Sequence, residues 1–197
     1  MKNIIFDMGN VLIKWAPAHF IEREGISDPG DAGLLMSAIY RSPEWPMLDR
    51  GDIDEPDMER IALERLPARL HKAAKRLISA WNDPIEPVDG MEDFVRECKA
   101  AGMGIYLLSN ASRRQSEYWP NVPASECFDG RVISAIDGFM KPDIGIYELL
   151  LNRYGLEAGD CLFVDDVKAN VDGAEAAGMK GFVFGGDVGE LRRAVFG

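Results

Sequence analysis

The chain has 197 residues, which is enough for one ordinary hydrophobic core and a smaller second unit. Hydrophobic residues make up 47% and charged residues 28% of it, as in soluble globular proteins, and a formal net charge of −11 argues against nucleic acid or an anionic membrane as the main partner. No apolar run reaches the roughly 18 residues of a membrane span, and no charged leader precedes an apolar stretch, so we expect a cytoplasmic protein. The three cysteines show no CxxC spacing, which favours small core side chains over disulfides or a thiolate metal site.

The first predicted strand is the apolar run Ile4–Phe6, which ends at Asp7. A short apolar run followed by turn-forming residues predicts a strand that is buried on both faces. Ligands bind outside the carboxyl ends of the strands in open parallel sheets, so Asp7 is a candidate for chemistry. The alternative for a lone aspartate at this position is a helix cap or a turn.

Helical periodicity then continues without another strand until about Trp81, and breakers such as Asp28-Pro29-Gly30 separate the segments. This pattern predicts an all-helical domain at residues 15–85, inserted into a core formed by residues 1–14 and 86–197. The apolar positions recur at helical spacing in three stretches, around Leu35, Met58 and Leu77. The expected hinges between the two domains are Leu12–Trp15 and Asn82–Pro87.

After the insert the chain alternates between helix and strand. Such alternation predicts an α/β fold with a doubly wound parallel sheet that helices cover on both faces. A helix around Phe94 ends near Gly102, a plausible stop signal. The later elements are expected as strands at residues 104–108, 132–133, 161–164 and 182–184, and as helices at residues 144–154 and 169–177.

Polar residues follow three of these strands, namely Asp7, Ser109 with Asn110, and Asp165 with Asp166. The carboxyl ends of parallel strands meet at one edge of the sheet, so we expect these side chains to share one cleft. Two adjacent carboxylates repel each other unless a cation compensates, and three carboxylates with neutral oxygens suit Mg²⁺. The alternative for the aspartate pair is a helix cap with a solvated neighbour.

Lys141 supplies a positive charge for this cleft. It precedes Pro142, which favours an extended backbone at the start of a helix. From there the lysine could pair with Asp7 and with an incoming phosphoryl group, although a lone lysine is more often solvated surface. Ser109 and Asn110 offer a hydroxyl and an amide to the oxygens of an anion, or act as helix caps.

The chain resembles the haloacid dehalogenase-like (HAD) hydrolase superfamily in four motifs, which occur in the superfamily's order: FDMGNVL, LLSN, KPDIGIY and FVDDVKANVDGA. The helical insert resembles the cap domain that this superfamily carries at the first of its two insertion positions. The resemblance implies a Rossmann-like HAD core with a small helical cap. The short first motif and the small cap are similar to bacterial sugar-phosphate phosphatases, among them an α-glucose-1-phosphate phosphatase.

The resemblance also implies roles for the residues of the cleft. Asp7 would be the nucleophile that forms an aspartyl-phosphate, and Lys141 would orient it and offset charge. Ser109, with Asn110 beside it, would bind the phosphoryl oxygens of a small phosphorylated metabolite. Mg²⁺ would be held by Asp7, by the backbone carbonyl of Gly9 and by Asp166, with Asp165 in or near the coordination shell.

Gly9 departs from the superfamily's pattern, because most of its phosphatases have a second aspartate there as general acid. Loss of such an acid typically costs about 10²–10⁴-fold in rate. The first hypothesis is therefore a phosphate with an already stabilised leaving group, such as an anomeric sugar phosphate or an acyl phosphate. Alternatively, a cap residue could deliver the proton, and the candidates are His19, Glu44, Asp49 and Asp52.

Two other classes of function remain open. The dehalogenases of the superfamily also lack the second aspartate, but they need no metal, and the Asp165-Asp166 pair would then hinder an anionic haloacid. The second class is a non-catalytic domain that binds a phosphorylated ligand or a partner protein. Arg113 and Arg114 either reach the substrate or lie on the surface.

Overall fold

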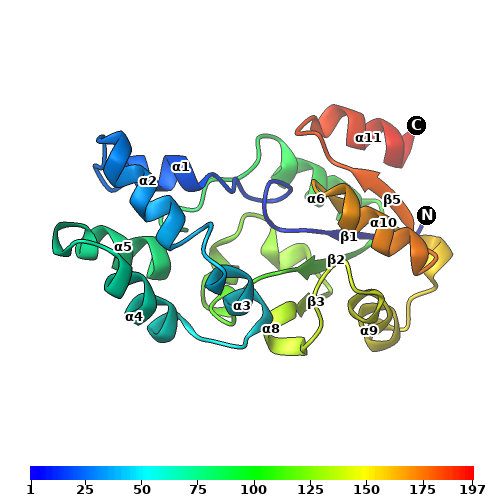
Figure 1. The fold of residues 1–197 in the computed structure, drawn as a ribbon. Coiled ribbons are helices and arrows are strands. Elements are labelled where there is room, and N and C mark those ends of the chain that lie inside the picture. Colours follow the sequence, from blue (N-terminus) through cyan, green and yellow to red (C-terminus); the bar gives the residue numbers. More distant parts are fainter.

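Five parallel strands form the central sheet of the structure, a computed structural model that describes residues 1–197 (Figure 1). Their order across the sheet is β3-β2-β1-β4-β5, so the first strand lies in the middle. Phe6 at the end of β1 pairs with Leu107 of β2 and with Val164 of β4. The next residues, Asp7 and Asp165, therefore lie at the same level of the sheet. The strands are β1 (Asn3–Phe6), β2 (Gly104–Ser109), β3 (Gly130–Ile133), β4 (Cys161–Asp165) and β5 (Lys180–Val183).

Helices cover both faces of this sheet, which confirms the predicted doubly wound architecture. The side chains of β1 alternate between the faces: Ile4 and Phe6 pack with α6 and α11, and Ile5 packs with α9 and α10. The helices around the sheet are α6 (Met91–Ala100), α7 (Gln115–Tyr118), α8 (Ser134–Asp137), α9 (Ile144–Tyr154), α10 (Lys168–Ala176) and α11 (Val188–Phe196), with 3₁₀ turns at Trp119–Asn121, Ser125–Cys127 and Ala158–Asp160.

The predicted elements agree with the structure except at some ends. The helix at residues 144–154 is confirmed, and α6 stops just before Gly102, whose φ of 80° is the left-handed conformation of a helix stop. The last strand lies at Lys180–Val183 rather than 182–184. Phe184 continues beyond it as a buried residue that donates its N–H to Asp165, which made the apolar run appear to end later.

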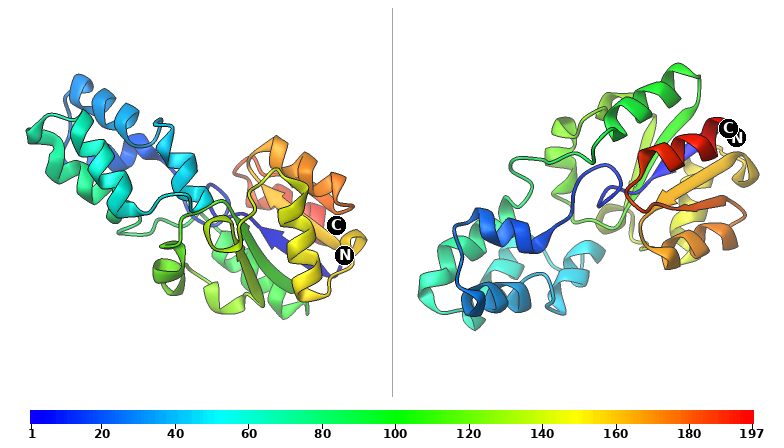
Figure 2. Two further views of the ribbon diagram at one scale, coloured as in Figure 1. Left: turned by 60° about the horizontal axis from the view of Figure 1, so that its bottom comes forward. Right: turned by 90° about the horizontal axis from the view of Figure 1, so that it is seen from above.

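A second group of helices lies beyond the carboxyl ends of the strands (Figures 1 and 2). Thirteen buried residues between Phe20 and Ile78 form a hydrophobic core of its own, separate from the two cores on the sheet. These helices are α1 (Pro17–Arg23), α2 (Pro29–Ala38), α3 (Glu44–Arg50), α4 (Glu55–Arg65) and α5 (His71–Ser79), with a 3₁₀ turn at Ala68–Leu70. None of the helices is long and apolar enough to cross a membrane.

Pro29 and Gly30, interpreted above as breakers, instead belong to the first turn of α2. The carboxylate of Asp28 accepts the backbone N–H of Asp31, and Pro29 occupies the first helical position. Proline is tolerated there because its missing N–H would have no partner in the helix. The segment therefore starts a helix.

The helix α3 differs from the other four because it packs against α8 of the sheet domain (Figure 1). The hydroxyl of Ser134, the first residue of α8, donates a hydrogen bond to the carbonyl of Asp49. Gly51 ends α3 with a φ of 81°, and a β-carbon at this position would lie 2.6 Å from the carbonyl oxygen of Ala135. Thus the end of α3 is fixed to the sheet domain.

Candidate active site

A buried lysine links two carboxylates at the carboxyl edge of the sheet. Lys141, in the loop before α9, places its Nζ 2.7 Å from Oδ1 of Asp7 and 2.6 Å from Oδ2 of Asp165. The side chains of Lys141 and Asp165 are 1% and 0% exposed. Asp165 also accepts hydrogen bonds from the backbone N–H of Val167 and from the amide of Asn170, so both its oxygens have partners within the protein. We conclude that Asp165 holds Lys141 in place beside Asp7.

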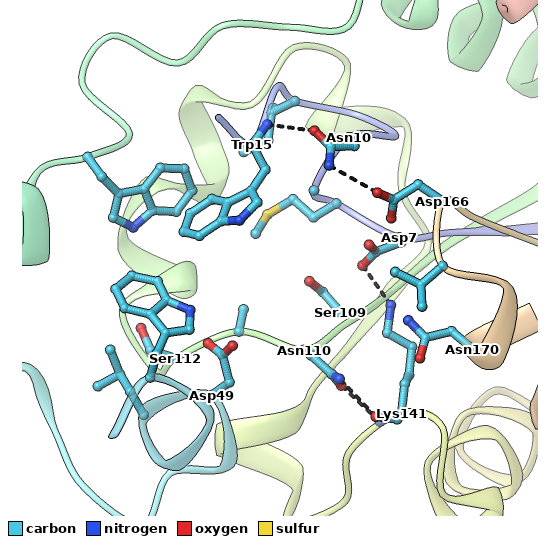
Figure 3. Close-up of a pocket in the computed structure, with 18 of the residues that line it drawn as sticks. Asp7, Asn10, Trp15, Asp49, Ser109, Asn110, Ser112, Lys141, Asp166 and Asn170 are labelled. Atoms are coloured by element: carbon cyan, nitrogen blue, oxygen red, sulfur yellow. Dashed lines mark hydrogen bonds and ion pairs between the residues drawn. The ribbon is translucent and has the colours of Figure 1, made fainter. Parts of the chain in front are cut away.

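The other aspartate of the pair, Asp166, faces the loop after β1 (Figure 3). Its Oδ2 accepts a hydrogen bond of 3.0 Å from the amide of Asn10, whose own carbonyl oxygen accepts the backbone N–H of Trp15. Asn10 has a φ of 54°, a left-handed conformation that asparagine tolerates better than most residues. This side chain fixes the loop against Asp166. Asn10 has no role that its sequence context predicts, because neither the turn nor its distant partner is visible in the sequence.

The arrangement fits a hard divalent cation. One ligand atom each of Asp7, Asp165 and Asp166 lie within 4.8 Å of one another. Asp165 forms an ion pair with Lys141. The second carboxylate oxygen of Asp7 and the carboxylate of Asp166 form no ion pair. Two carboxylate oxygens with a nearby backbone carbonyl such as that of Gly9 form the all-oxygen donor set that Mg²⁺ prefers. The residues present therefore suit the ion.

Burial and charge shift the titration of these groups. Burial is the main reason that the pKa of Asp7 is raised to about 6; Lys141 opposes this shift, and Asp165 contributes to it. Burial by itself lowers the pKa of Lys141, but the two carboxylates outweigh it and hold this pKa above its ordinary value. Lys141 therefore stays charged, and the Asp7 carboxylate depends on nearby cations to remain ionised.

The two predicted phosphate-binding residues at the end of β2 differ in what they contact. Ser109 is buried and lines the cavity beside Asp7 (Figure 3). The side chain of Asn110 also borders the cavity, but its amide donates to the carbonyl of Lys141 (3.0 Å) and its oxygen accepts the N–H of Lys141 (2.9 Å). The contacts of Asn110 thus hold the backbone of Lys141.

A cavity of about 220 Å³ is lined by residues of both the sheet domain and the helical domain. Its floor includes Asp7, Ser109 and Lys141, and its other wall is largely aromatic. Trp15 lies edge-on to Trp81 at 4.6 Å between ring centroids and is tilted against Trp45 at 5.4 Å. The helical domain also contributes two carboxylates, those of Asp49 and Glu55. We did not expect this wall, although three of the four tryptophans in the chain belong to it.

Three of the four proposed proton donors in the cap lie outside this cavity, as do Arg113 and Arg114. His19 lies 3.1 Å from Glu86, Glu44 forms a two-pronged ion pair with Arg65, and Asp52 is exposed beside Arg50. Arg113 donates to the carbonyl of Ala135, and Arg114 donates to the side chain of Asn82. Of the four candidate proton donors named from the sequence, Asp49 alone lines the cavity.

Several known proteins are similar to this chain in sequence. The family model of the haloacid dehalogenase-like hydrolases matches residues 1–178. The chain is 29% identical to the sesquiterpene phosphatase astK of Aspergillus oryzae, covering 91% of this chain and 88% of that protein. It is 23% identical to a phosphorylated carbohydrates phosphatase of Thermotoga maritima, covering 91% and 83% of the two chains.

Solved structures share the fold. A HAD-family enzyme of Bacteroides thetaiotaomicron, in complex with magnesium and inorganic phosphate, has a TM-score of 0.69 at 18% identity and covers 97% of this chain and 98% of its own. The L-2-haloacid dehalogenase of Xanthobacter autotrophicus has a TM-score of 0.66 at 15% identity, covering 92% and 76% of the two chains. With its four motifs, its sheet and its family match in agreement, the chain belongs to the haloacid dehalogenase-like hydrolases.

Proposed function

We propose that this hydrolase is a Mg²⁺-dependent phosphatase of small phosphorylated metabolites, with Asp7 as the nucleophile. The observation that carries the proposal is the position of Asp7 at the floor of the cavity, with one oxygen 2.7 Å from Lys141 and the other not paired with a cation. A carboxylate oriented in this way can attack phosphorus while the lysine offsets the charge that accumulates. The phosphatases among the relatives support the same reaction class.

The residues of the site have distinct proposed tasks. Asp7 attacks phosphorus to form an aspartyl-phosphate as the bond to the ester oxygen breaks and the alcohol leaves, and water then releases inorganic phosphate and restores Asp7. Lys141 orients Asp7, and the hydroxyl of Ser109 binds a phosphoryl oxygen. Asp7, Asp166 and the carbonyl of Gly9 would hold Mg²⁺, and Asp165 would act through Lys141. A bound Mg²⁺ supplies positive charge that lets a dianionic phosphate approach a carboxylate.

Sugar phosphates are the proposed substrate class, in line with the sequence prediction. The carbohydrate phosphatase among the relatives supports this class, whereas the sesquiterpene phosphatase supports an apolar leaving group, which the wall of Trp15, Trp45 and Trp81 would also suit. A preference for anomeric phosphates follows if the leaving oxygen departs without a proton, and this basis for the preference is lost if a group in the cavity supplies one. It fails if simple alkyl phosphates are hydrolysed equally fast.

The test is the release of inorganic phosphate from a panel of anomeric, alkyl, prenyl and acyl phosphates, with Mg²⁺ or with EDTA. We expect turnover that requires Mg²⁺ and that is lost in Asp7→Asn. Release of halide from 2-chloropropionate without phosphatase activity would favour the dehalogenase alternative. Stoichiometric binding of phosphate esters without turnover would favour a non-catalytic domain.

A further inference from the structure

The proposed reaction lacks a proton donor next to the nucleophile. Gly9, two residues after Asp7, has no side chain, and a β-carbon at this position would already touch Trp15 Cβ at 3.6 Å. An alkoxide is a poor leaving group unless it receives a proton as the bond breaks. If the protein hydrolyses ordinary phosphate esters, another group must supply this proton from across the cavity.

Two carboxylates of the helical domain border the cavity, and their contacts distinguish them. Glu55 accepts a hydrogen bond of 2.6 Å from the hydroxyl of Ser112, which ties it to the sheet domain. Asp49 projects into the cavity from α3, on the side facing Asp7 and Ser109 (Figure 3), and its carboxylate has no ion pair and no hydrogen bond. Resting on the proposed function, we propose that Asp49 is the general acid that protonates the leaving oxygen and then the general base that activates water.

The backbone around Asp49 is built to keep this side chain in place. The carbonyl of Asp49 accepts the hydroxyl proton of Ser134, and Gly51 lies directly against the backbone of Ala135. Both contacts attach α3 to the sheet domain, which also carries Asp7. Direct contacts with the sheet domain therefore position Asp49 relative to Asp7, although α3 also packs against α4.

The electrostatic surroundings support the same role. Burial is the largest of the effects that together raise the pKa of Asp49 to about 8; the charges of Asp7 and Glu55 act in the same direction, and that of Lys141 opposes them. Most molecules then carry the proton at neutral pH. An acid with a pKa near the working pH can both donate a proton and recover it.

The two steps balance as follows. An oxygen of Asp7 forms a bond to phosphorus as the bond from phosphorus to the ester oxygen breaks, and the Asp49 carboxyl gives its proton to that oxygen, which leaves as the alcohol. The resulting Asp49 carboxylate takes a proton from water while the water oxygen attacks phosphorus. The bond between phosphorus and Asp7 breaks, so that inorganic phosphate and the original carboxylate are restored.

The test compares two aromatic substrates of similar size, benzyl phosphate and p-nitrophenyl phosphate, in the presence of Mg²⁺. The leaving oxygen of benzyl phosphate departs as an alkoxide unless it receives a proton, whereas p-nitrophenolate is a good leaving group without a proton. We expect Asp49→Asn to lower kcat/KM for benzyl phosphate by about 10²-fold or more and that for p-nitrophenyl phosphate by less than about 10-fold. The constant kcat/KM is chosen because it covers the steps up to release of the alcohol.

Retained hydrolysis of p-nitrophenyl phosphate shows that the variant folds and keeps its nucleophile. Asp52→Asn, which removes the same charge from an exposed position of the same segment, should leave both substrates unaffected. Equal losses on both substrates, or none on either, would overturn the proposed role of Asp49 but leave the proposed phosphatase function standing. A wild-type protein without Mg²⁺-dependent turnover, or an active Asp7→Asn variant, would overturn the proposed function with it.

Discussion

Lys141 and Asp165 form an ion pair, with 2.6 Å between Nζ and Oδ2, in which neither side chain is accessible to solvent. The same ammonium also pairs with Asp7, so one cation serves two buried carboxylates. Removing one partner of a buried pair is costly because the other charge is left without compensation. Asp165 has no bulk water to solvate it.

Lys141→Met should therefore both inactivate and destabilise the protein. We expect a loss of about 3–5 kcal/mol in the free energy of unfolding in EDTA, since Asp165 loses its buried counter-charge. Mg²⁺ should restore part of this stability by offering another cation to Asp7. Urea unfolding with and without Mg²⁺ measures both effects, and Lys168→Met, at an exposed pair with Asp172, is the control. Unchanged unfolding of Lys141→Met in EDTA would contradict the structure.

Asp166→Asn should weaken Mg²⁺ binding while leaving the fold intact. The asparagine keeps an oxygen for the hydrogen bond from Asn10 but loses the negative charge that attracts the ion. We expect the Mg²⁺ concentration for half-maximal phosphatase activity to rise about 10-fold or more. Titration calorimetry with Mg²⁺ gives an independent measurement. Asp172 pairs with Lys168 and does not line the cavity, so Asp172→Asn should behave as wild type. An equal rise in both variants would argue against a metal role for Asp166.

The polar floor of the cavity could be anticipated from local sequence alone. Asp7 and Asp165 directly follow apolar runs of the sequence, and the rule that ligands lie at the carboxyl edge of a parallel sheet brings them together. Their register, with Phe6 paired to Val164, agrees with that expectation. The sheet and its helices were predictable for the same reason, because short-range hydrophobic patterns determine where each element lies.

Other contacts depend on pairings that no local pattern encodes. The amide of Asn110 bonds both backbone groups of Lys141, thirty-one residues further along the chain. The docking of α3 onto α8 likewise depends on Ser134 and on a close approach between Gly51 and Ala135. Since these contacts join segments that are distant in the chain, the sequence identified Asp49 only as one of four candidate donors.

Gly51→Ala should show whether the position of α3 affects activity, apart from the loss of stability that backbone strain alone would cause. Alanine at a φ of 81° costs about 1–2 kcal/mol, and here its β-carbon would also lie 2.6 Å from the carbonyl oxygen of Ala135. Gly25→Ala is a matched control, because Gly25 has a φ of 78° with open space around it. We expect thermal unfolding to be lowered in both variants and more in Gly51→Ala. Hydrolysis of benzyl phosphate should fall in Gly51→Ala alone, and an equal fall in both would show that α3 does not position the site.

The raised pKa of Asp49 predicts that this residue destabilises the protein at neutral pH. Its pKa is about 8 in the folded chain, whereas aspartate in an unfolded chain titrates near about 4. Between these values the folded state holds a proton that the unfolded state has released, so stability falls as the pH rises through this window. Asp49→Asn removes that cost. In EDTA we expect the variant to match wild type near pH 4 and to have the higher Tm near pH 8, with Asp52→Asn as the control for loss of one charge. A Tm difference that does not change with pH would mean that Asp49 is ionised at neutral pH and cannot donate a proton.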